Sequence, residues 1–140
     1  GGLRIGWGYG PRHVIDVLNR VRGPFNVGTP AQVAGVAALR DMDFAAESAR
    51  ANRETRAVLE AGLVGLGLTT VPSVANFVLV RFPDQPGQTA ADIDGKLRAR
   101  GYIVRRMEAY GLAPFLRISV GTAAENAGFL AALEDALRSP

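Results

Sequence analysis

The sequence of 140 residues contains no cysteine, one histidine and one lysine. Without cysteine the chain has no disulfide framework, no thiolate nucleophile and no cysteine-ligated metal site. A lone histidine, His13, excludes a metal motif of paired histidines, and its place in the first turn of an expected helix favours an exposed or capping role. We therefore predict no metal site. Because Lys96 is the only lysine, lysine-dependent chemistry must use it or a lysine supplied from elsewhere.

The positive charge of the chain is small and dispersed. The formal net charge is +3, and all of the 16 basic residues except Lys96 are arginines. Arg50 and Arg56 each precede a glutamate by four residues, a spacing that pairs opposite charges on one helix face. No Lys/Arg tract of the kind that follows a phosphate backbone is present, so we expect no nucleic-acid partner.

Residues 61–80 form a stretch without a charged residue that must be tested as a membrane span. Three glycines and Pro72 interrupt it, whereas a spanning helix needs about 20 predominantly apolar residues. The pattern instead predicts a helix end, a turn and a buried strand. No secretory signal is recognisable, and we expect a cytoplasmic protein with no membrane partner.

The first 43 residues predict a strand and two helices. Leu3 to Tyr9 is short, apolar and interrupted by glycine, which is typical of a buried strand. Pro11 fits the first turn of a helix that runs to Arg22. Thr29 is the expected N-cap of a second helix, with Pro30 at its first position, ending near residue 41. The expected strand has no sheet to join in this part of the chain.

Residues 44–140 predict a compact unit of the α+β or α/β class that is large enough to fold. The expected order is helix, strand, helix, strand, strand, helix. The helices are expected at residues 44–66, after a capping box of Thr89 and Asp92, and after a capping box of Thr122 and Glu125. The strands are expected at residues 76–82, 102–106 and 115–120. The run at residues 76–82 is apolar at both alternating sets of positions, which is typical of a central strand covered on both sides.

Arginines embedded in the expected strands are the main candidates for chemistry. Arg4, Arg105 and Arg117 each lie in or beside an apolar run. A guanidinium is always charged and costly to bury, so each requires an anion. That anion is either a structural carboxylate or the carboxylate or phosphate of a ligand. Glycines at positions 6, 8 and 10 do not have the spacing of a dinucleotide-binding loop. We find no candidate catalytic nucleophile.

Five segments, in this order, carry a resemblance to a known family. They are residues 2–6 (Gly-Leu-Arg-Ile-Gly), 19–27 (Asn-Arg-Val-Arg-Gly-Pro-Phe-Asn-Val), 75–80 (Ala-Asn-Phe-Val-Leu-Val), 101–105 (Gly-Tyr-Ile-Val-Arg) and 116–122 (Leu-Arg-Ile-Ser-Val-Gly-Thr). The chain resembles histidinol-phosphate aminotransferases, which are pyridoxal-phosphate enzymes with the fold type I architecture of aspartate aminotransferase. The resemblance runs from residue 2 to the C-terminal helix.

The resemblance implies that the chain is the C-terminal part of such an enzyme. Residues 1–43 correspond to the tail of the large cofactor-binding domain, and residues 44–140 to the small C-terminal domain. The family's Ser-Lys motif, whose lysine binds the cofactor covalently, stands just before Gly-Leu-Arg-x-Gly and therefore upstream of this chain. Lys96 matches no catalytic position, so the isolated chain is expected to hold no catalytic residue and to be inactive.

The resemblance also implies roles for the three arginines. Arg4 corresponds to the arginine that binds the phosphate of pyridoxal phosphate. Arg117 corresponds to the arginine that binds the carboxylate of glutamate in one half-reaction and the phosphate of histidinol phosphate in the other. Arg105 corresponds to its helper on the phosphate, and strand alternation directs Arg106 to the other face. The expected substrates are histidinol phosphate and glutamate or 2-oxoglutarate, and the expected assembly is a homodimer.

Two other interpretations remain open. One is an enzyme with the same scaffold and another substrate, such as an aromatic-amino-acid aminotransferase or a phosphothreonine decarboxylase. The other is a non-catalytic fragment or a partner-binding module.

Overall fold

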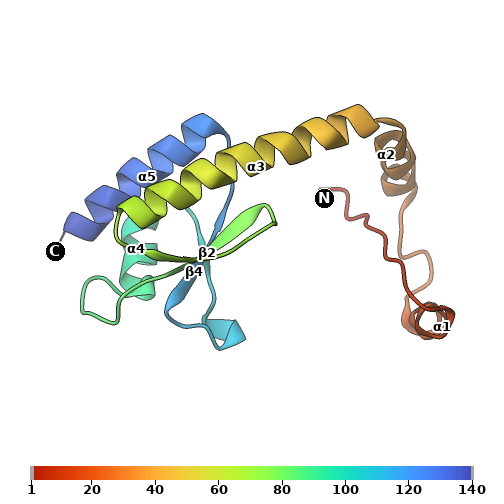
Figure 1. The fold of residues 1–140 in the computed structure, drawn as a ribbon. Helices are drawn as coiled ribbons and strands as arrows, with labels where there is room; N and C mark the ends of the chain where they lie inside the picture. Colours follow the sequence, from red (N-terminus) through yellow and green to blue (C-terminus); the bar gives the residue numbers. More distant parts are fainter. Residues whose placement is uncertain (1, 140) are drawn as a thin grey trace. The chain divides into compact units, whose positions relative to one another are not determined.

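The computed structural model describes residues 2–139, which form two compact units. The first unit ends at Glu47 and the second begins at Ser48. Figure 1 shows a long helix, α3 (Met42–Gly65), whose residues belong to both.

The first unit contains α1 (Arg12–Val21), α2 (Thr29–Arg40) and the start of α3. The helix expected after Pro11 is confirmed. The N-cap expected at Thr29 is wrong by one residue. Gly28 is the N-cap, Thr29 is the first helical residue, and the Gly28 carbonyl accepts a hydrogen bond from the Gln32 amide at 3.1 Å. Glycine and threonine are both accepted at an N-cap, so sequence preference alone does not separate them.

The strand expected from Leu3 to Tyr9 is wrong: residues 4–10 have no regular secondary structure. Arg4 has a left-handed backbone (φ 59°), which interrupts an extended conformation. A strand also needs a hydrogen-bonded neighbour, and in the part of the chain that the structure describes every strand begins at Thr69 or later.

The second unit contains one antiparallel sheet. Its strands are β1 (Thr69–Val71), β2 (Phe77–Arg81), β3 (Arg105–Arg106) and β4 (Phe115–Ser119), arranged β1-β2-β4-β3. The strands expected at residues 76–82 and 115–120 are confirmed. The one expected at 102–106 is limited to two residues, and β1 was not predicted. A strand of three residues has too short a pattern to be recognised before its partner is known.

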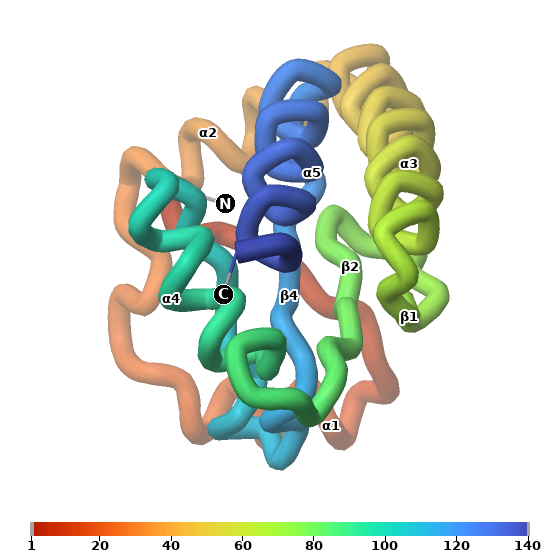
Figure 2. Tube along the Cα trace, turned by 90° about the vertical axis from the view of Figure 1, so that its left-hand side faces the viewer, coloured from red at the N-terminus to blue at the C-terminus, as the bar shows by residue number. Residues whose placement is uncertain are grey.

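Three helices cover one face of this sheet. They are the second-unit part of α3, α4 (Ala90–Ala99) and α5 (Ala123–Arg138), and they lie side by side on the same side of β2 and β4 in Figures 1 and 2. Both expected capping boxes, at Thr89 and Thr122, are confirmed. The core between helices and sheet consists of residues that are almost fully buried: Leu59, Leu63, Val78, Val80, Ile93, Leu97, Leu116, Ile118 and Leu133. These findings confirm the expected fold class.

The expectation that β2 is covered on both sides is wrong for the helices of this unit. Val78 and Val80 are buried in the core, whereas Phe77 and Leu79 are half-buried on the other face. Apolar residues at every position of β2 therefore do not require helices on both faces of this sheet.

Candidate anion-binding site

Arg105 and Arg117 are brought together by the pairing of β3 with β4. Arg105 is the direct cross-strand partner of Arg117, and Leu79 of β2 is the partner of Arg117 on its other side. Directly paired residues lie on the same face of a sheet. Since Leu116 and Ile118 point into the helix-covered core, Arg117 lies on the opposite face. We call this face, with Phe77, Leu79, Arg81, Arg105, Phe115, Arg117 and Ser119, the arginine face.

The electrostatics of this pair are unbalanced. Like charges directly opposite one another in a sheet destabilise it. No strand residue of the arginine face is acidic. Within residues 2–139, the buried Nε of Arg117 has no hydrogen-bond acceptor, and no ion pair of this guanidinium is formed. An anion between the two arginines would both separate the like charges and satisfy this donor.

Each of the two guanidiniums lies against an aromatic ring. The Arg117 Cζ is 5.1 Å from the ring centroid of Phe77. The Arg105 Cζ is 5.6 Å from the ring of Tyr110, and its Nη2 donates a hydrogen bond to the Tyr110 hydroxyl at 2.8 Å. Tyr110 ends a short 3-10 helix, Glu108–Tyr110, which is closed by Gly111 with φ 73°. These contacts fix the guanidiniums without a negative charge.

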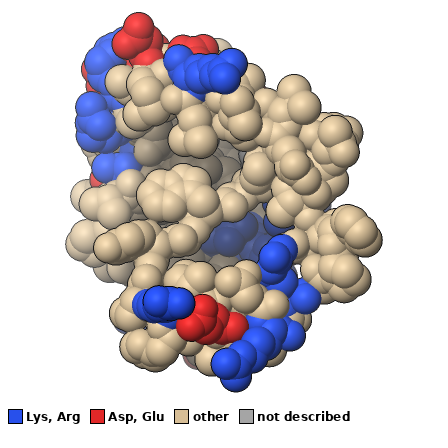
Figure 3. Space-filling model, turned by 90° about the vertical axis from the view of Figure 1, so that its right-hand side faces the viewer, with Lys and Arg blue, Asp and Glu red and all other residues tan. Residues whose placement is uncertain are grey.

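Arg106, the neighbour of Arg105, shows the opposite arrangement. It pairs with Leu116, which confirms that alternation directs it away from the arginine face. Its guanidinium forms an ion pair with Glu108 at 2.6 Å. Arg98 and Arg100 also have carboxylate partners. In Figure 3 acidic side chains lie beside basic ones at the top and bottom of the face drawn. Arg117 differs from these arginines in being held by a ring.

Sequence reasoning did not identify three residues of this face and its surroundings: Phe77, Tyr110 and Arg81. The alternation along residues 77–81 carried a signal for Phe77 and Arg81, but the register of β2 on β4 was needed to place them beside Arg117. Arg81 is exposed on the same face. No sequence pattern indicated Tyr110, because its contact depends on the turn through Gly111.

Arg4, the third predicted arginine, belongs to the first unit, where it is exposed. Its left-handed backbone is uncommon for a residue with a Cβ.

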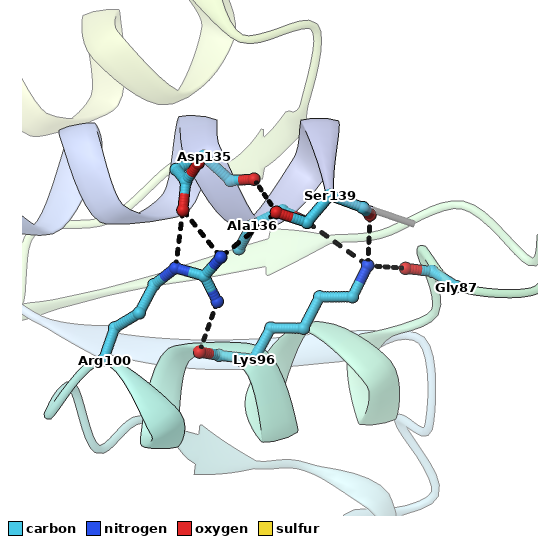
Figure 4. A network of polar contacts seen from close by, with 6 residues as sticks. All are labelled: Gly87, Lys96, Arg100, Asp135, Ala136 and Ser139. Atoms are coloured by element: carbon cyan, nitrogen blue, oxygen red, sulfur yellow. Dashed lines mark hydrogen bonds and ion pairs between the residues drawn. The ribbon is translucent and has the colours of Figure 1, made fainter.

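Lys96 is a structural residue of the second unit. Figure 4 shows its ammonium between the loop before α4 and the end of α5. It donates hydrogen bonds to the carbonyls of Gly87 (2.9 Å), Ala136 (3.4 Å) and Ser139 (2.6 Å). Arg100, one turn further along α4, donates to the Lys96 carbonyl and pairs with Asp135. An ammonium has three hydrogens, so these carbonyls occupy its full donor capacity.

The two acidic residues of the capping boxes have lowered pKa values. The pKa of Asp92 is lowered chiefly by the hydrogen bond from the Thr89 hydroxyl, at 2.6 Å. The pKa of Glu125 is lowered chiefly by the backbone N–H of Thr122, at 2.8 Å, and then by its hydroxyl. Both carboxylates lie at helix N-termini, so they are structural anions and not part of the arginine site.

Residues 2–139 contain no group of three or more His, Asp or Glu side chains placed to hold a metal ion. No helix among these residues is long and apolar enough to cross a membrane.

Comparison with known proteins identifies the family. The model of the family described as aminotransferase class I and II matches residues 1–133, so the chain belongs to this family. It is 48% identical over 98% of its length to the histidinol-phosphate aminotransferase of Maricaulis maris, of which it covers 38%. It is 51% identical over 96% of its length to that of Paramagnetospirillum magneticum, of which it covers 37%.

A solved structure gives the same relationship. The histidinol-phosphate aminotransferase of Sinorhizobium meliloti, in complex with pyridoxal 5'-phosphate, superimposes with a TM-score of 0.77 at 26% identity, over 90% of this chain and 34% of that one. This confirms the expected resemblance. The chain thus spans little more than a third of the relatives it matches.

Proposed function

We propose that this chain is the C-terminal part of a pyridoxal-phosphate-dependent aminotransferase that acts on histidinol phosphate and 2-oxoglutarate in histidine biosynthesis. The observation that carries the proposal is the pair of directly opposed arginines, Arg105 and Arg117, with the buried, unpartnered Nε of Arg117. The identity to two histidinol-phosphate aminotransferases supports this substrate class.

Arg117 would bind the substrate anion and fix its orientation. A planar guanidinium binds a carboxylate or a phosphate through two parallel hydrogen bonds, so one residue can serve both half-reactions. It would take the carboxylate of glutamate in one and the phosphate of histidinol phosphate in the other. Arg105, directly opposite, would add a second cation that matters more for the doubly charged phosphate than for a carboxylate.

The residues of this chain fit one end of the cofactor. Arg4 is an exposed residue, and its planar guanidinium is a donor set of the kind that binds a phosphate. Lys96 does not fit as the covalent attachment site, because three backbone carbonyls already surround its ammonium. When bound, the cofactor supplies the electron sink for amino-group transfer. This chain would contribute phosphate binding at Arg4 and substrate binding at Arg117, and the attaching lysine would come from outside it.

We further propose a cytoplasmic homodimer for the complete enzyme. Large apolar side chains of the first unit are exposed, among them Trp7 (85%), Tyr9 (96%) and Phe25 (99%). Exposed apolar surface of this kind promotes association. Sedimentation of a full-length enzyme that carries this segment should show a dimer over a range of concentrations, and a monomer at every concentration would contradict this.

The substrate proposal is tested in a full-length enzyme that carries this segment. Histidinol phosphate should be a far better substrate than histidinol, which lacks the phosphate. Arg117→Ala should lower kcat/KM for histidinol phosphate and for glutamate by a factor on the order of one hundred. Arg117→Lys keeps the charge and loses the bidentate geometry, so its kcat/KM should fall between that of the unchanged enzyme and that of Arg117→Ala.

Arg106→Gln is the matched control, because it removes one charge from β3, the strand beside Arg117, on the opposite face of the sheet. Its kcat/KM should equal that of the unchanged enzyme. An enzyme that prefers an aromatic amino acid over histidinol phosphate, or that releases carbon dioxide from its substrate, would replace the proposal with one of the alternatives. Unchanged kinetics in Arg117→Ala would remove Arg117 from the site.

A further inference from the structure

The two arginines of the site are held differently from Arg100 and Arg106. Arg100 and Arg106 are fixed by carboxylates of Asp135 and Glu108. Arg117 lies against the ring of Phe77 and Arg105 against the ring of Tyr110. A carboxylate neutralises a guanidinium and occupies its N–H groups, whereas a ring face restricts its position and leaves both charge and donors available.

The position of Phe77 in β2 allows its ring to restrict the guanidinium of Arg117. Phe77 is paired with Ser119, which places it diagonally to Arg117 on the same face of neighbouring strands. Diagonal neighbours in a sheet are within reach of aromatic and long side chains. Phe77 is half-buried, and its neighbour Val78 is completely buried in the core, so its backbone is firmly placed.

Tyr110 holds Arg105 at two points. Its ring lies under the guanidinium, and its hydroxyl accepts the hydrogen bond from Nη2 at 2.8 Å. A ring alone leaves the guanidinium free to turn in its own plane, and the hydroxyl removes that freedom. The remaining N–H groups of Arg105 are thus directed by a neutral residue.

We infer that Phe77 and Tyr110 are positioning residues, which hold Arg117 and Arg105 as an uncompensated cationic pair for a phosphate group. This inference rests on the proposed function, which assigns the substrate anion to the same pair. It goes further in explaining how two like charges are kept opposite one another without a neutralising carboxylate. Pre-placing the donors lowers the ordering cost that binding would otherwise carry.

Inorganic phosphate and the 140-residue chain provide the test. In a ¹⁵N-labelled sample at low salt, the Nε–Hε signal of Arg117, assigned with Arg117→Lys, should shift saturably as phosphate is added. Phe77→Leu and Tyr110→Leu should each weaken the apparent affinity for phosphate by about fivefold. Tyr110→Phe, which keeps the ring and loses the hydroxyl, should fall between Tyr110→Leu and the unchanged chain.

Two variants separate positioning from a structural role. Phe115→Leu removes another half-buried ring from the arginine face, one that forms no cation–π contact with Arg105 or Arg117 in the described structure, and should leave phosphate affinity unchanged. Phe77→Tyr keeps a ring under Arg117, so its phosphate affinity should equal that of the unchanged chain. This holds even if Phe77→Leu also lowers the thermal midpoint of unfolding.

The outcomes distinguish this inference from the proposed function. Equal phosphate affinity in the unchanged chain, Phe77→Leu and Tyr110→Leu would overturn the positioning role. The anion site at Arg105 and Arg117 would still be supported by that result. An equal loss in Phe115→Leu, or no recovery in Phe77→Tyr, would also overturn the positioning role. Absence of any saturable shift at Arg117 in the unchanged chain would overturn the anion site itself, and the inference with it.

Discussion

Arg105 lies directly opposite Arg117 across β3 and β4, so two positive side chains occupy one cross-strand pair. Like charges placed directly opposite one another destabilise a sheet. The described residues offer the Arg117 guanidinium no carboxylate to offset that cost. In this pair, unlike in the ion pairs of Arg100 and Arg106, the positive charges have no carboxylate partner among residues 2–139.

A first prediction concerns the stability of this pair. Arg117→Leu should change the free energy of unfolding by no more than about 1 kcal/mol, because it removes like-charge repulsion and leaves no carboxylate without a partner. Urea unfolding of the 140-residue chain measures the change. A loss of several kcal/mol would instead identify Arg117 as a structural ion-pair partner.

A second prediction concerns Lys96. Addition of pyridoxal phosphate followed by borohydride should give no stoichiometric adduct at Lys96, because its three hydrogens are directed at backbone carbonyls. Visible absorbance and peptide mass analysis provide the measurement. Lys96→Met should lower stability by about 1–3 kcal/mol by leaving these carbonyls without their donor. An adduct on Lys96 that supports amino transfer would contradict the structural role.

A third prediction compares two helical glycines. A Cβ at Gly62 of α3 would collide with the Leu130 side chain of α5, whereas a Cβ at Gly95 of α4 meets nothing within 4 Å. Gly62→Ala therefore requires the Leu130 side chain to shift, which offsets the gain in helix propensity, so the free energy of unfolding should be about 1–3 kcal/mol lower in Gly62→Ala than in Gly95→Ala. Gly95→Ala should stabilise the chain by about 0.5–1 kcal/mol through helix propensity.

Urea unfolding of both glycine variants measures these changes. Equal effects of the two substitutions would show that α3 and α5 are not packed at Gly62 as described.

A fourth prediction concerns pH. Hydrogen bonds from Thr122 lower the pKa of Glu125 below its usual 4.5, and those from Thr89 act in the same direction on Asp92, usually 3.8. A carboxyl whose pKa is lower in the folded chain stabilises it above the unfolded value, and this stability is lost as the pH falls through the folded pKa. The thermal midpoint should therefore fall as the pH is lowered from about 5.

The control for the pH prediction is Thr122→Ala, which removes the hydroxyl partner of Glu125. The fall of its midpoint with pH should be shallower than that of the unchanged chain. Identical pH profiles would mean that the hydrogen bond from the Thr122 hydroxyl does not contribute to the pH dependence of stability.

Local features of the second unit could be predicted from the sequence. The capping boxes at Thr89 and Thr122 involve residues three positions apart, so the sequence contains all of their parts. The same holds for the alternation that places Arg117 opposite the core, because it depends only on Leu116 and Ile118 beside it. Short-range rules are sufficient where every partner is a near neighbour in the chain.

The sequence by itself determined the fold class, the family resemblance and the placement of Arg117 opposite the core. Only the tertiary structure decided that Arg105 faces Arg117, that Phe77 lies under one guanidinium, and that Lys96 is bound by the end of α5. It also decided that residues 4–10 form no strand. These contacts join positions brought together by strand register and helix packing, and a register is set by the whole buried face of a strand rather than by the residues it places side by side.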